Sequence, residues 1–140
     1  MTIDANRLIE NMQSMEETWL RGCRLRSCWF EPTFHKHAGQ LCAGLQIHVE
    51  AIDYDHARFR PWRLMALAFK ALRALRPDYP LWRDFPYEYE TRLPIDVING
   101  GSLLRQWVDD PAARPEDLDA AARADEDAWR EEREAVLLYR

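Results

Sequence analysis

Side chains that could bind a metal ion or move a proton gather between residues 33 and 48. The polar stretch Thr33–Gly39 (TFHKHAG) carries His35 and His37, and Cys42 and His48 follow it. Imidazole and thiolate groups are good zinc ligands, and four of them could close a tetrahedral site. The segment has neither a CxxC pair nor an HExxH motif, so the zinc pattern is weak. We therefore expect a polar loop whose histidines hydrogen-bond locally, with no metal ion.

A second group of side chains that could bind a ligand or transfer a proton lies in Pro86–Glu90 (PYEYE). In an extended segment Glu88 and Glu90 project to one face, and Tyr87 projects to the other. Carboxylates two residues apart lie roughly 6–7 Å from each other, which overlaps the separations that glycosidases use. Repulsion between them would raise the pKa of one carboxyl group, as a general acid requires. The pair is a candidate for ligand contact or acid catalysis, and the alternative is a solvated edge strand.

The composition argues against several classes of protein. The 140 residues carry a net charge of −5, whereas dedicated nucleic-acid binders have a basic surplus. No apolar run approaches the roughly 20 residues of a membrane-spanning helix. The N-terminus lacks a basic region followed by an apolar core, so we expect no signal peptide and, for the chain as it stands, a cytoplasmic location; the alternative is a fragment of a longer secreted protein. Phosphate-binding glycine loops are absent and the three cysteines have no regular spacing, so we expect neither a cofactor nor a disulfide framework.

The periodicity of apolar residues predicts one small α+β domain over residues 1–140. Asp4 can cap the first helix, and Gly22 suits the position after its end. The two clearest strands follow each other with no helix between them, which favours an α+β fold, with a mixed or antiparallel sheet packed against helices, over a doubly wound sheet. The predicted order is α-β-β-α-β-α-α-β, from a helix between Asp4 and Leu20, strands Cys23–Phe30 and Gly44–Glu50, a helix Trp62–Leu75, a strand Phe85–Tyr89, helices Ser102–Val108 and Pro115–Arg133, and a strand Val136–Tyr139, with a helical turn at Pro94–Ile98.

Several stretches together resemble a known family. Pro32–Val49 (PTFHKHAGQLCAGLQIHV) is similar to a signature in the C-terminal part of the NamZ-type exo-β-N-acetylmuramidases, long carried as a domain of unknown function. The resemblance continues through Phe59–Leu75, Pro86–Glu90, Leu93–Gly100 and Val136–Tyr139 with its order intact, so it covers nearly the whole chain. The family often has serine where His35 stands, which further weakens the zinc interpretation.

The resemblance implies an auxiliary domain of a bacterial glycosidase that acts on peptidoglycan fragments. Such enzymes release N-acetylmuramic acid and look like two-domain proteins, with the sugar cleft between a larger Rossmann-like N-terminal domain and a smaller α+β domain. This chain resembles the smaller domain alone, so we expect the Rossmann-like domain to be absent from it. The expected partners are that domain or a separately encoded equivalent, a muropeptide or amino-sugar ligand, and a second copy in a homodimer.

The resemblance also selects the polar residues that would line the cleft or hold its shape. The catalytic residue is left unassigned, because it can belong to the missing domain. The alternative function is a non-catalytic module that dimerises or docks on a separately encoded partner. The cleft candidates are Lys36, His37, Gln46, His48, Tyr87, Glu88, Glu90 and Asp96.

Overall fold

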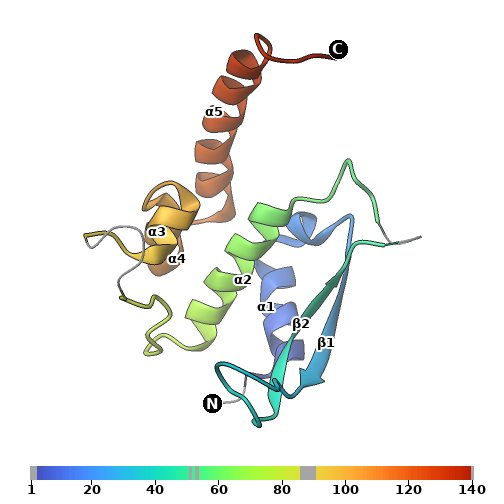
Figure 1. The fold of residues 1–140 in the computed structure, drawn as a ribbon, viewed down its shortest axis with the longest axis vertical. Coiled ribbons are helices and arrows are strands. Elements are labelled where there is room, and N and C mark those ends of the chain that lie inside the picture. Colours follow the sequence, from blue (N-terminus) through green and yellow to red (C-terminus); the bar gives the residue numbers. More distant parts are fainter. Residues whose placement is uncertain (1–2, 51, 53, 86–90, 140) are drawn as a thin grey trace. The chain divides into compact units, whose positions relative to one another are not determined.

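The computed structural model describes residues 3–50, 52, 54–85 and 91–139. The chain forms two compact units, Met1–Leu81 and Trp82–Arg140. In Figure 1 the first unit runs from blue to green and the second from yellow to red. No helix within the described ranges is long and apolar enough to cross a membrane.

The first unit is built on two helices that pack against each other, α1 (Ala5–Glu16) and α2 (Pro61–Leu75), with the short 3-10 helix η1 (Glu17–Leu20) after α1. Asp4 caps α1 as predicted, because its Oδ1 accepts hydrogen bonds from the backbone N–H groups of Asn6 and Arg7 at 3.0 and 3.2 Å. Apolar residues recur at helical spacing along both helices and are buried. The buried set includes Leu8, Met12, Trp19, Leu64, Leu67 and Ala71.

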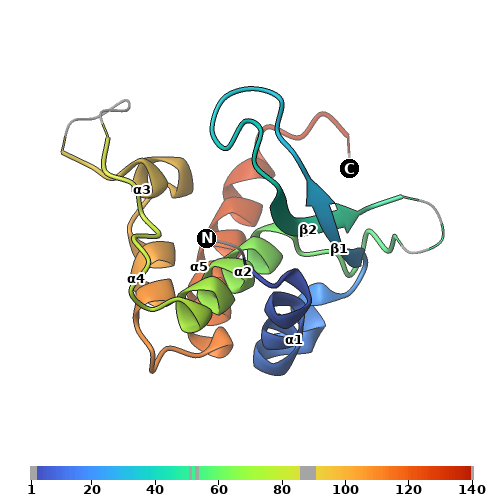
Figure 2. The same ribbon diagram turned by 90° about the horizontal axis from the view of Figure 1, so that it is seen from below.

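The strands β1 (Arg24–Phe30) and β2 (Cys42–His48) pair as an antiparallel hairpin that packs against α1, as Figure 2 shows. Arg24 pairs with His48 at the open end of the hairpin, and Phe30 pairs with Cys42 beside the connecting loop. The second strand begins and ends two residues earlier than the sequence pattern predicts. Residues 31–41 form a loop, in agreement with the expectation for this polar stretch.

The described residues of the second unit form three helices, α3 (Pro94–Asn99), α4 (Leu103–Asp109) and α5 (Pro115–Arg133). Trp107 is buried and its indole N–H donates to the carbonyl of Arg114 at 2.7 Å, which fixes the turn between α4 and α5. Asp117 accepts from the backbone N–H of Arg114 at 2.8 Å and so closes the start of α5. Ser102 occupies the position before α4, but its side chain makes no capping hydrogen bond.

The α+β class and the order of the described helices and strands confirm the prediction, with one correction, at the last predicted strand. Val136–Tyr139 is not a strand; the segment is a turn and irregular chain, and Leu138 and Tyr139 are 90% and 87% exposed. A strand is stabilised by hydrogen bonds to a neighbouring strand, and the described sheet pairs β1 with β2 alone. Phe85 lies in irregular chain, and residues 86–90 of the other predicted strand lie outside the described residues.

Gly22 joins η1 to β1 at a point where a side chain does not fit. Its φ is +81°, and its carbonyl accepts a hydrogen bond from the backbone N–H of Asp55 at 3.1 Å. A Cβ atom at this position would lie 2.5 Å from the backbone nitrogen of Phe59 and 2.6 Å from the carbonyl oxygen of Asp55. Glycine is therefore required both by the left-handed backbone and by the loop that closes on it.

Replacing Gly22 by alanine should destabilise the protein more than replacing Gly39. Gly39 also has a positive φ, of +71°, but an added Cβ meets nothing within 4 Å. Both variants should lose about 1–2 kcal/mol of unfolding free energy for the left-handed backbone, and Gly22→Ala should lose about 1–3 kcal/mol more for the clash. Urea denaturation measures both values, and equal losses would contradict the crowding at Gly22.

Candidate functional site

The hairpin sorts its side chains onto two different faces. Residues that pair directly in an antiparallel sheet share a face, and faces alternate along each strand. One face carries Leu25, Leu45 and Ile47, which are partly buried. The opposite face carries two polar pairs, and we call these four residues the hairpin polar face: Arg24, Arg26, Gln46 and His48.

Hydrogen bonds fix the groups of the hairpin polar face. The Nη2 of Arg26 donates to the Oε1 of Gln46, its direct partner across the strands. The Nδ1 of His48 lies 3.2 Å from the Oε1 of Glu50, and the His48 side chain is 24% exposed. Since a carboxylate only accepts hydrogen bonds, this contact places a proton on Nδ1. Gln46 and His48, two predicted cleft residues, thus lie two residues apart on one ordered face.

An aromatic ring bounds the hairpin polar face on the side of the loop. Phe30 lies on the same face as Arg26, and its ring covers Gly44 of the opposite strand. A Cβ added to Gly44 would lie 2.9 Å from the Cε1 atom of Phe30. Because glycine has no side chain, the ring of Phe30 fills the space above Gly44. The half-exposed ring is thereby held beside the polar groups.

Lys36 and His37 lie in the loop at the other end of the hairpin from His48. Six residue steps separate Cys42 from His48, which corresponds to roughly 20 Å along the strand. Both loop residues are exposed, and the Nδ1 of His37 lies 3.4 Å from the Oε1 of Gln40. The histidine and cysteine cluster that the sequence places together is thus spread along the hairpin. In the described part of the chain, no group of three or more His, Cys, Asp or Glu side chains is arranged to hold a metal ion.

The loop backbone takes up conformations that L-residues rarely adopt. His35 and His37 have φ angles of 60° and 62°, and Gly39 has 71°. The N–H of Gly39 donates to the carbonyl of Pro32 at 2.9 Å, and the N–H of Gln40 donates to that of His37 at 3.0 Å. These bonds close the loop into a defined shape and hold the left-handed residues in place.

Asp96 lies in the second unit, where it forms a two-pronged ion pair with Arg105. Its Oδ1 accepts from Nε of Arg105 at 2.9 Å, and its Oδ2 accepts from Nε and Nη2 at 3.1 and 2.7 Å. This carboxylate raises the pKa of Arg105, chiefly through the side-chain hydrogen bonds. Since both carboxylate oxygens are engaged and the side chain of Asp96 is 13% exposed, the pair ties α3 to α4. The sequence pattern did not indicate Arg105 as a partner of Asp96. Arg105 lies nine residues after Asp96, on the next short helix.

Three predicted cleft residues, Tyr87, Glu88 and Glu90, lie outside the described residues. Their roles remain predictions.

The three thiols differ in their surroundings. All three cysteines are free. Burial raises the pKa of the Cys23 thiol, whose Sγ lies 3.6 Å from the carbonyl of Leu20. A raised pKa lowers the thiolate fraction, so Cys23 is a poor nucleophile.

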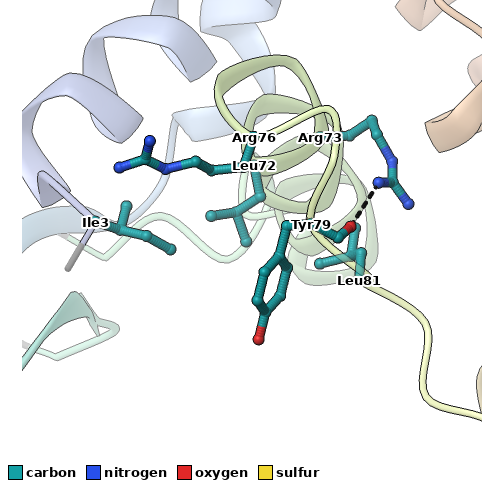
Figure 3. A pocket seen from close by; sticks show the side chains of 6 residues that line it. All are labelled: Ile3, Leu72, Arg73, Arg76, Tyr79 and Leu81. Atoms are coloured by element: carbon teal, nitrogen blue, oxygen red, sulfur yellow. Dashed lines mark hydrogen bonds between the residues drawn. The ribbon is translucent and has the colours of Figure 1, made fainter. Parts of the chain in front are cut away.

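A small pocket lies at the C-terminal end of α2, shown in Figure 3. Leu72, Tyr79 and Leu81 line it together with Ile3, and its volume is about 50 Å³. Nη1 of Arg73 donates to the carbonyl of Tyr79 at 2.8 Å and holds the chain that follows the helix. Ligand pockets usually enclose about 300–1,000 Å³, so this pocket is too small for a sugar.

The segment that forms the hairpin has the opposite charge to the chain as a whole. Arg24–His48 contains three basic residues and one acidic residue, a net charge of +2, whereas the whole chain carries −5. Sequence reasoning missed Arg24 and Arg26. Their alternation with Leu25 in a predicted strand was the available signal, because it places both guanidinium groups on one face.

The fold and the hairpin polar face together define a small α+β domain with an exposed donor-rich surface. A family model described as "Exo-beta-N-acetylmuramidase NamZ, C-terminal" matches residues 1–139. The chain therefore belongs to this family of C-terminal glycosidase domains. Among curated proteins no match was found, and none was found among solved structures.

A double-mutant cycle of Asp96→Asn and Arg105→Gln should show energetic coupling. Because the pair is partly buried and two-pronged, we expect a coupling energy of about 0.5–3 kcal/mol in urea denaturation. The matched control is the pair Asp127 and Arg130 on α5, whose side chains are 68% and 60% exposed. Exposed pairs contribute little, so the control coupling should be close to zero. Equal coupling in both cycles would refute the structural role of Asp96.

Proposed function

We propose that the hairpin polar face forms one wall of the sugar-binding cleft in an exo-β-N-acetylmuramidase. The observation that carries this proposal is the grid of three exposed side chains, Arg24, Arg26 and Gln46, and the half-buried His48 in a chain of this family. Sugars are recognised by hydrogen bonds to their hydroxyl and amide groups. The grid supplies guanidinium and amide donors, and His48 adds its imidazole ring.

The ligand we propose is the N-acetylmuramic acid end of a peptidoglycan fragment. The other wall, with the catalytic residue, would come from a Rossmann-like N-terminal domain, on the same polypeptide or encoded separately. Tyr87, Glu88 and Glu90 are proposed to contact the sugar, and Lys36 and His37 to contact the partner domain from the loop.

Exposed apolar side chains at the loop end of the hairpin support the proposed docking of another domain. Trp29, Phe30, Phe34 and Leu41, which we call the hairpin tip, are between 50% and 71% exposed. Surfaces that a partner covers are richer in aromatic residues than surfaces that face water. The same observation favours the second candidate function, a non-catalytic module that docks on a partner or on a second copy.

The chain alone should not hydrolyse a chromogenic β-glycoside of N-acetylmuramic acid, and a mixture with an N-terminal domain of the family should. Phe34→Ser and Leu41→Ser should each reduce the rate of the mixture at limiting partner concentration, because they remove apolar contact area. Release of the chromophore measures the rate, and the dependence on partner concentration gives the affinity.

The control variant for the hairpin tip is Ile98→Ser, which changes a 71% exposed side chain on α3. It should leave the rate unchanged. Full turnover by the isolated chain would contradict the need for a partner. If the domains bind each other but no glycoside is cleaved, the second candidate function is favoured.

Glu88→Gln and Glu90→Gln should weaken sugar binding by the assembled enzyme and leave folding intact. A carboxylate that accepts a sugar hydroxyl makes a charge-assisted hydrogen bond, whose loss costs about 1.5–3 kcal/mol. Calorimetric titration with N-acetylmuramic acid measures the affinity, and Glu131→Gln on α5 is the surface control. Unchanged affinity in both variants would remove the two glutamates from the site.

A further inference from the structure

The hairpin polar face presents hydrogen-bond donors in a compact arrangement. Directly paired residues of an antiparallel sheet have Cβ atoms about 5 Å apart, and residues two apart on a strand lie roughly 7 Å apart. Arg24 and Arg26 therefore form one side of a rectangle, and His48 and Gln46 form the other. A ligand group of three or four heavy atoms could contact both guanidinium groups at once.

The contact between Arg26 and Gln46 adds to the donor character of the face. The amide oxygen of Gln46 accepts from Arg26, so the amide NH₂ group of Gln46 is directed elsewhere as a donor. The same bond restricts the rotamers of the Arg26 side chain, which lowers the entropy cost of binding a ligand. Such a surface suits a ligand group that is negatively charged and only accepts hydrogen bonds.

Charge distinguishes this surface from its surroundings. The hairpin segment Arg24–His48 has a net charge of +2 within a chain of −5, so the hairpin attracts anions more than the rest of the chain does. Glu50 lies at the edge of this face, where its Oε1 is 3.2 Å from the Nδ1 of His48. The positive charges of Arg24 and Arg26 would attract an anionic ligand to this face.

N-acetylmuramic acid differs from N-acetylglucosamine by a lactyl ether that ends in a carboxylate. Arginine binds carboxylates through two parallel N–H···O bonds, with geometry that lysine cannot reproduce. We propose that Arg24 and Arg26 bind this lactyl carboxylate and thereby select muramic acid over glucosamine ends. The proposal rests on the proposed function, because it assigns one part of the sugar to one part of that cleft.

The half-exposed ring of Phe30 gives the subsite an apolar boundary. It lies on the same face, toward the loop, where its ring covers Gly44. The lactyl group carries a methyl substituent beside its carboxylate. The ring of Phe30 thus offers an apolar contact to a ligand that extends from the arginines toward the loop.

The first experiment compares two substrates on the enzyme assembled with the N-terminal domain. One is the β-glycoside of N-acetylmuramic acid, and the other is the same glycoside with the lactyl carboxylate converted to an amide. Arg24→Gln and Arg26→Gln should each raise KM for the acid about 10- to 100-fold, as expected for a lost charge-assisted bond. The KM for the amide should change less than about threefold. Arg21→Gln, outside the hairpin polar face, should change neither value.

The second experiment observes the chain alone, so that it does not depend on catalysis. Arginine Nε–H resonances are followed by NMR during titration with N-acetylmuramic acid, N-acetylglucosamine or acetate. N-acetylmuramic acid should shift the resonances of Arg24 and Arg26, and N-acetylglucosamine should not. Equal shifts with acetate at equal concentration would reduce the site to a non-specific anion contact and overturn the proposal.

The two experiments separate the two hypotheses. If the assembly is active but the variants affect the acid and the amide substrate equally, the carboxylate subsite is overturned. The proposed function is left standing in that case. An assembly without turnover, combined with specific shifts at Arg24 and Arg26, overturns the proposed function and supports the carboxylate subsite. Circular dichroism of each variant excludes unfolding as the cause of a loss.

Discussion

The register of one strand pair determines what the hairpin can bind. Arg24 faces His48 and Arg26 faces Gln46 because β1 and β2 pair in this register and in no other. A slip of one residue would move every side chain of one strand to the opposite face and break up the donor-rich grid. Phe30 opposes such a slip, because its ring needs the space above Gly44. A packing contact between an aromatic ring and a glycine thus supports the polar chemistry two residues away.

Most of the fold could be predicted from the sequence, because its helices carry strong local signals. Asp4 provides an N-terminal cap, Pro61 and Pro115 occupy first helical turns, and apolar residues recur with helical spacing. The failure at Val136–Tyr139 has a physical cause. An apolar run with strand-forming side chains becomes a strand only beside a partner, and hydrophobic patterning carries no information on whether that partner is present.

The site was harder to predict than the fold, because strand pairing joins residues that are far apart in the sequence. Alternation correctly placed Gln46 and His48 on one face, but it did not identify the arginines opposite them on β1. Clustering along the sequence was misleading for His37 and His48, since an extended strand carries them to opposite ends of the hairpin. The family resemblance selected Asp96 as a residue that lines the cleft or holds its shape, and the structure adds a salt bridge to Arg105 that joins α3 to α4.

The left-handed residues of the loop have a consequence for recognition kinetics. A loop that is free to sample many conformations must be ordered when a partner arrives, and that ordering slows productive encounter and weakens the complex. His35, His37 and Gly39 commit the backbone to an uncommon shape before any encounter, and the bond from Gly39 to Pro32 closes it. The aromatic side chains beside this loop are therefore displayed on a prepared framework. Association through these side chains would therefore be closer to rigid-body docking than to coupled folding and binding.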